Sequence, residues 1–106
     1  MISGKEIGEI LKLYAKHGWI LRRVLLSDNL RGNLADDLFG ETEIRSANLD
    51  AVWFSRESNS GEAWEIRHLS NAPFALVEVF PDDMDDIERE ERLNELQTRL
   101  MNRTSK

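Results

Sequence analysis

The most informative segment of this sequence predicts one amphipathic helix that leads directly into a strand; it spans residues 3–23 and reads SGKEIGEILKLYAKHGWILRR. Ser3 and Glu6 have the spacing of a capping box, in which each side chain binds a backbone N–H at the start of the helix. Gly18 stands where a glycine with positive φ commonly ends a helix. Residues 19–26 are rich in large and branched apolar residues, as strands are. The apolar stripe of the helix consists of Ile7, Ile10, Leu11 and Tyr14.

Length and composition favour one domain over residues 1–106 with a modest core, since 41% of the residues are hydrophobic. The chain has 14 Lys and Arg against 20 Asp and Glu, a net charge of −6. Proteins that bind duplexes need cationic side chains against the phosphates, so we do not expect nucleic acid as a partner. The absence of cysteine excludes disulfides and suits a reducing cytoplasm. We expect neither a signal peptide nor a membrane span.

The stretch 27–50 carries many turn-forming residues and only scattered apolar ones. A loop of this length within a small domain is uncommon and is often functional or poorly ordered. We interpret it as a surface excursion held to the domain by its larger apolar side chains. These are Leu34, Leu38 and Phe39.

Residues 51–56 and 63–69 predict a β-hairpin around the polar connection 57–61. Placing Phe54 opposite Trp64 gathers the apolar side chains on one face and leaves Trp53 on the more polar face beside Arg67. The face predicted to be buried consists of Val52, Phe54, Trp64 and Ile66.

A further strand is predicted over residues 74–80, and a last helix is predicted after Pro81, capped by Asp82 or Asp83. The element order is therefore α-β-loop-β-β-β-α. We predict an α+β fold with an antiparallel sheet of about four strands and both helices on one face. The expected buried stripe of the last helix is Met84, Ile87, Leu93, Leu96 and Leu100.

The acidic run that begins at Asp82 complements the dipole of the last helix and lacks the glycine of a calcium loop. Glycines 32, 40 and 61 do not form a phosphate-binding loop. We therefore predict no metal and no cofactor. His17 is expected to interact with the free carbonyl groups in the last turn of the first helix.

Four residues are candidates for a ligand site. Arg23, Arg67 and Trp53 could form a groove in which a base stacks, although an arginine that covers a partly exposed tryptophan is the commoner arrangement. Adjacent Arg22 and Arg23 are expected on opposite faces of their strand. His68 stands near a strand end and could act as a general base, but no Ser, Asp or Glu accompanies it at a recognised spacing. We assign no catalytic residue.

The first segment resembles the start of the HicA/YcfA-type small proteins, toxin components of bacterial toxin–antitoxin pairs. The matching residues are Lys5-Glu6, Leu11, Gly18-Trp19 and Arg22 or Arg23. The resemblance implies a fold like that of double-stranded-RNA-binding domains, α-β-β-β-α. In that family the strand leads into a Gly-Ser-His element whose histidine cleaves RNA. Residues 24–28 read VLLSD here and contain neither glycine nor histidine, so the resemblance does not extend to the nuclease activity.

Two functions are compatible with the sequence. We favour a small non-catalytic interaction or regulatory module that forms a homodimer through its sheet, because the strands are apolar on both faces and helices on one side would cover only one. The stretch 27–50 could instead cover the second face. The alternative function is an RNA-acting protein of HicA-like ancestry that uses His68 and nearby arginines.

Overall fold

Five strands and three helices make up the computed structural model, which describes residues 2–72 and 74–104. The predicted α+β class is confirmed, and the capping box of Ser3 and Glu6 is present. Gly18 ends the first helix with φ +84°. The elements are α1 (Gly4–Lys16), β1 (Ile20–Leu26), α2 (Asp28–Arg31), β2 (Ile44–Ser46), β3 (Ala51–Ser58), β4 (Gly61–His68), β5 (Ala75–Phe80) and α3 (Asp86–Thr104).

The strands form one mixed sheet in the order β2-β1-β3-β4-β5. The pairs β1/β3, β3/β4 and β4/β5 are antiparallel, whereas β2 runs parallel to β1. The prediction of about four antiparallel strands is therefore only roughly correct. The strand that it lacks, β2, has three residues, which is too few to produce a recognisable alternation of apolar and polar positions.

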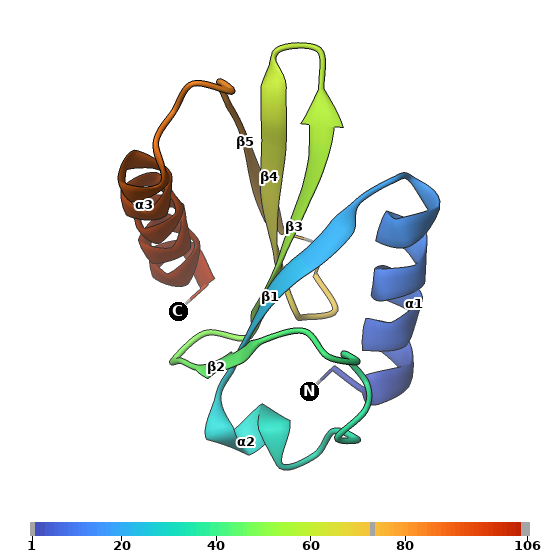
Figure 1. The fold of residues 1–106 in the computed structure, drawn as a ribbon. Coiled ribbons are helices and arrows are strands. Elements are labelled where there is room, and N and C mark those ends of the chain that lie inside the picture. Colours follow the sequence, from blue (N-terminus) through green and yellow to red (C-terminus); the bar gives the residue numbers. More distant parts are fainter. Residues whose placement is uncertain (1, 73, 105–106) are drawn as a thin grey trace.

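The two long helices lie on opposite faces of the sheet (Figure 1), so the prediction that both share one face is wrong. Each helix buries a separate apolar cluster. The cluster under α3, which we call the α3 core, consists of Leu25, Leu49, Ala51, Trp53, Trp64, Ile66, Phe80, Leu93, Leu96 and Leu100. The cluster under α1, the α1 core, consists of Ile2, Ile7, Val24, Leu26, Leu30, Phe39, Val52, Phe54 and Leu69.

The β3/β4 hairpin differs by one residue from the predicted register. Ser55, not Phe54, lies opposite Trp64, and Trp53 lies opposite Ile66. The strands extend beyond the predicted connection 57–61, as far as Ser58 and Gly61. The turn therefore has only two residues, and this shorter turn sets a different pairing. Trp53 therefore points into the α3 core and Phe54 into the α1 core. The predicted register requires a single buried face, whereas both faces of this hairpin are buried, which is why it is wrong.

Strand β1 contains a bulge between Leu21 and Arg23, where its register against β3 shifts. A bulge inserts one extra residue and interrupts the alternation of side chains. Arg22 Nε donates a hydrogen bond to Ser55 Oγ at 2.6 Å, and Arg23 lies opposite Trp53. Both arginines thus lie on the α3 face, which corrects the expectation that they point to opposite faces.

The stretch 27–50 is held to the α1 face by its larger apolar side chains, as expected from the sequence, and it does not cover a face free of helices, because each face carries one. Leu30 in α2 and Phe39 are buried in the α1 core, and Leu34 and Leu38 pack against it. Asp50 accepts hydrogen bonds from the backbone N–H and the hydroxyl of Ser27, at 2.7 and 3.2 Å, and so ties the two ends of the stretch together.

Helix α3 begins later than predicted. Asp85, rather than Asp82 or Asp83, accepts a hydrogen bond from a backbone N–H of the first turn, that of Glu88 at 2.8 Å. Ile87 is 73% exposed and does not belong to the buried stripe. The prediction is confirmed for Leu93, Leu96 and Leu100, which are buried in the α3 core.

Candidate functional site

The predicted groove of Arg23, Arg67 and Trp53 is not present. Trp53 is completely buried. Arg23 lies on the same face and is paired with Glu90 of α3. Arg67 lies opposite Val52 and therefore on the α1 face. The sheet separates the two arginines, and the indole is not accessible for stacking.

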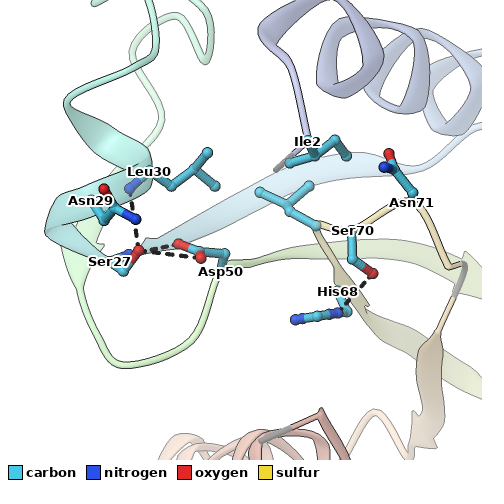
Figure 2. Close-up of a pocket in the computed structure, with 9 residues that line it drawn as sticks. Ile2, Ser27, Asn29, Leu30, Asp50, His68, Ser70 and Asn71 are labelled. Atoms are coloured by element: carbon cyan, nitrogen blue, oxygen red, sulfur yellow. Dashed lines mark hydrogen bonds between the residues drawn. The ribbon is translucent and has the colours of Figure 1, made fainter. Parts of the chain in front are cut away.

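His68 lines a cavity of about 400 Å³ at the end of the sheet (Figure 2). The polar residues of the wall come from three connections: Ser27 and Asn29 after β1, Asp50 before β3, and Ser70 and Asn71 after β4. The apolar part of the wall is formed by Ile2, Leu30 and Leu69. The cavity therefore brings a histidine, a carboxylate and hydroxyl groups together from separate parts of the chain.

Hydrogen bonds fix the orientation of the His68 ring. Ser70 Oγ donates its one proton to the carbonyl oxygen of Ala72 at 2.8 Å. The contact of 2.9 Å between His68 Nδ1 and Ser70 Oγ must then be donated by Nδ1–H. The neutral ring consequently carries its free lone pair on Nε2. Burial lowers the pKa of His68 and so favours this neutral form; the charge of Asp50 opposes the shift and that of Arg67 adds to it.

The Ser70–His68 pair is not arranged like the nucleophile and base of a hydrolase. In such sites the histidine takes the proton of the hydroxyl, whereas here the histidine is the donor. The carboxylate of Asp50 is occupied by Ser27. The geometry supports a structural role for His68 at the end of β4.

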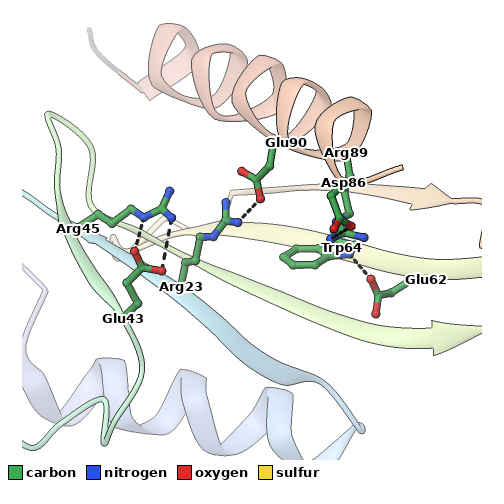
Figure 3. Close-up of polar contacts among 8 residues, drawn as sticks. All are labelled: Arg23, Glu43, Arg45, Glu62, Trp64, Asp86, Arg89 and Glu90. Atoms are coloured by element: carbon green, nitrogen blue, oxygen red, sulfur yellow. Dashed lines mark hydrogen bonds and ion pairs between the residues drawn. The ribbon is translucent and has the colours of Figure 1, made fainter. Parts of the chain in front are cut away.

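Two arginines on the α3 face lie near Trp64, and Figure 3 shows one of them, Arg89, beside the indole. The guanidinium carbons of Arg22 and Arg89 lie 6.0 and 5.9 Å from the centroid of the Trp64 ring. Trp64 Nε1 donates a hydrogen bond of 2.7 Å to Glu62. Neighbouring arginines form ion pairs, of which the first below connects β1 with α3, the second is local to the start of β2 and the third lies within α3. These pairs are Arg23–Glu90, Arg45–Glu43 and Arg89–Asp86.

The pairing compensates the positive charge of this surface. The hydrogen bond from Arg23 lowers the pKa of Glu90, and that from Arg45 lowers the pKa of Glu43. Both carboxylates are therefore ionised at neutral pH. A phosphate would have to displace these carboxylates, so the arginine cluster is better suited to holding α3 on the sheet than to binding nucleic acid.

The α1 face of the sheet is covered over only part of its width. Helix α1 packs on β1 and β3, and Tyr14 reaches β4 with a hydrogen bond from its hydroxyl to Glu65. Beyond this contact, Val77 and Val79 of β5 are 58% and 44% exposed. The uncovered part of the face therefore presents large apolar side chains at the margin of the sheet.

The backbone of β5 has an outward-facing row of hydrogen-bonding groups. His68 N–H donates to the carbonyl oxygen of Phe74 at 2.8 Å. Hydrogen-bonded pairs alternate along an antiparallel ladder, and the β4/β5 register continues without a shift. The N–H and C=O groups that point away from β4 thus belong to Ala75, Val77 and Val79. Because β5 is the last strand of the sheet, these groups lie along its open edge.

Comparison with known proteins gives no match to a family model, to a curated protein or to a solved structure. The resemblance to the HicA/YcfA-type proteins stays a prediction. No helix among residues 2–72 and 74–104 is long and apolar enough to cross a membrane.

The hydrogen bond between His68 and Ser70 and the position of β5 at the edge of the sheet were not predicted from the sequence. The spacing of His68 and Ser70 was an available signal, because residues i and i+2 at a strand end point to the same side. Asp50 is distant from His68 in the sequence, and only the pairing of β3 with β4 brings the two residues near each other. The apolar character of both faces of β5 was visible, but its position at the edge depends on the order of the strands.

Proposed function

We propose that this protein is a small non-catalytic interaction module that binds a protein partner by strand addition at β5. The open row of backbone groups on Ala75, Val77 and Val79 carries this proposal. An extended partner strand would bind these groups through main-chain hydrogen bonds, which is a common mode of peptide recognition. The side chains of the same three residues are exposed and would supply the apolar part of the contact.

Strand β5 has exposed apolar side chains along an unpaired backbone edge, a combination that proteins usually avoid. Edge strands are commonly protected by charges, prolines, bulges or a covering loop, because an open edge can pair with another chain. Within β5 the one charged side chain is Glu78, and two hydrogen bonds from Arg92 hold it towards α3. The outward-facing positions of β5 therefore lack the usual protection against pairing.

A photo-crosslinking amino acid in place of Val77 tests this function in the cells that produce the protein. We expect adducts with a protein, identified by mass spectrometry, at Val77. The matched control is the same replacement at Ile87, an exposed apolar position of α3. Absence of protein adducts at Val77, or equal adducts at both positions, would contradict the proposed function.

The RNA-acting alternative receives less support from the described residues. It requires basic side chains around His68. Arg67 is the adjacent arginine, and its guanidinium donates to the backbone carbonyl of His68. The ratio of absorbance at 260 and 280 nm of the purified protein tests the alternative, since bound RNA would raise it.

A further inference from the structure

We propose that the partner of β5 is a second copy of this chain, paired antiparallel about a two-fold axis at Val77. The inference rests on the proposed function and names the partner for that site. The resulting dimer would join two five-stranded sheets into one continuous sheet. Closed two-fold dimers are the commonest assemblies of soluble proteins.

The spacing of the outward backbone groups is self-complementary. With Val77 opposite Val77 of the second copy, Ala75 of each chain lies opposite Val79 of the other. All three pairs are then hydrogen-bonded pairs, with two N–H···O=C bonds in each. Axes at Leu76 or Glu78 would retain only two such pairs within β5. The axis at Val77 thus satisfies the largest number of edge groups.

The side chains favour the same axis. An axis at Glu78 would place two like charges directly opposite each other, which destabilises a strand pair. An axis at Val77 places Glu78 opposite Leu76 of the second copy. On the α1 face, the axis joins the exposed side chains of both copies into one apolar patch. This patch consists of Ala75, Val77 and Val79 from each chain.

The net charge of the chain opposes association. Each copy has a net charge of −6, so two copies repel each other, and dissolved salt screens this repulsion. The proposed interface is formed by backbone hydrogen bonds and apolar side chains, which salt does not weaken in this way. We therefore expect the dimer to become tighter as sodium chloride is raised from 20 to 300 mM.

Sedimentation velocity over a concentration series measures the association. Val77→Lys places two ammonium groups together at the axis, and we expect it to raise the dissociation constant of the dimer at least about tenfold. Ile87→Lys is the matched control, because it adds the same charge at an exposed position outside the interface. Circular dichroism establishes that both variants are folded. A wild-type chain that stays monomeric at high micromolar concentration would overturn the inference.

Cysteine substitutions test the register, because the chain has no cysteine of its own. In the proposed dimer the two Cα atoms at position 77 lie about 5.5 Å apart, within reach of a disulfide. The two Cα atoms at position 79 are out of reach of a disulfide, because position 79 of one copy lies opposite position 75 of the other. They are therefore offset by four residues along the strand, roughly 14 Å. We expect Val77→Cys to form a covalent dimer on oxidation and Val79→Cys to remain uncrosslinked. Crosslinking of Val79→Cys instead would contradict the proposed axis.

The experiments separate failure of this inference from failure of the proposed function. Photo-crosslinks from Val77 to a different protein, together with a monomeric chain in sedimentation, would support strand addition and overturn self-pairing. A dimer that Val77→Lys leaves intact would show that self-association uses another surface. Absence of any protein adduct at Val77 would overturn both.

Discussion

Gly61 lies so close to the backbone of Phe80 that a Cβ atom added to the glycine would be 2.0 Å from the Phe80 carbonyl oxygen. Its φ of +138° is also one that L side chains rarely adopt. We expect Gly61→Ala to lower the free energy of unfolding by at least about 2 kcal/mol, since a backbone contact cannot be relieved by a change of rotamer. Urea denaturation measures this loss.

Gly8 provides the matched control. It lies inside α1, and an added Cβ would meet no atom within 4 Å. Alanine has the higher helix propensity, so Gly8→Ala should raise the stability by about 0.5–1 kcal/mol. Equal effects of the two substitutions would contradict the close approach of β4 to the end of β5.

Trp53 and Phe54 should both be essential for stability, because each fills a different core. They are 0% and 1% exposed. We expect Trp53→Ala and Phe54→Ala each to cost about 3–5 kcal/mol in chemical denaturation. Ile87→Ala, at an exposed position, should change the stability by less than about 0.5 kcal/mol. A small loss for Trp53→Ala alone would favour the sequence-based register in place of the observed one.

His68 should titrate below its usual value of 6.5. Because the unfolded chain binds the proton more readily than the folded one, stability should fall as the pH decreases through 6.5 towards the pKa of the folded state. Titration of the ring signals by NMR measures the pKa. His68→Asn retains a donor near the Nδ1 position and should remove the pH dependence of stability in this range.

The tautomer of His68 offers a separate measurement. At neutral pH the ¹⁵N shifts should show a proton on Nδ1 and a lone pair on Nε2, since Ser70 accepts from Nδ1. Ser70→Ala removes that acceptor, and the Nε2–H tautomer should then gain population. The same tautomer in both proteins would contradict the proposed hydrogen-bond direction.

Tyr14 is the one tyrosine of the chain, so its ionisation can be followed by absorbance at 295 nm. Burial raises its pKa above the usual value of 10, and the hydrogen bond to Glu65 raises it further. In the native protein the phenolate signal should therefore be absent at pH 10.5, and it should appear when the protein is unfolded in urea at the same pH. The raised pKa also means that stability falls as the pH rises above 10.

The parts of the fold that depend on local sequence were predictable. The capping box at Ser3, the positive φ of Gly18 and the stripe of Leu93, Leu96 and Leu100 follow from spacing alone. The choice of buried face did not follow, because both faces of this sheet are apolar. With Trp53 in one core and Phe54 in the other, hydrophobicity does not distinguish one register from the next.

The candidate site was less predictable than the fold. Asp50 and Ser27 line the same cavity as His68 because of long-range strand pairing, and no local pattern in the sequence indicates this. The open edge of β5 depends on the order of all five strands, in which the short β2 occupies the opposite edge. The sequence did indicate that β5 is apolar on both faces, which is the property that the proposed pairing uses.

The bulge in β1 has a consequence for how the length of this chain can vary. Because Arg22 and Arg23 are adjacent and identical, loss of either arginine leaves the same sequence. The shorter strand could pair with β3 as a regular ladder, with Leu21 still opposite Phe54 and Val24 still opposite Val52. Loss of a residue between Val24 and Leu26 would instead exchange the side chains of the two cores. Position 22 is thus the place in β1 where evolution could remove a residue without redirecting the rest of the strand.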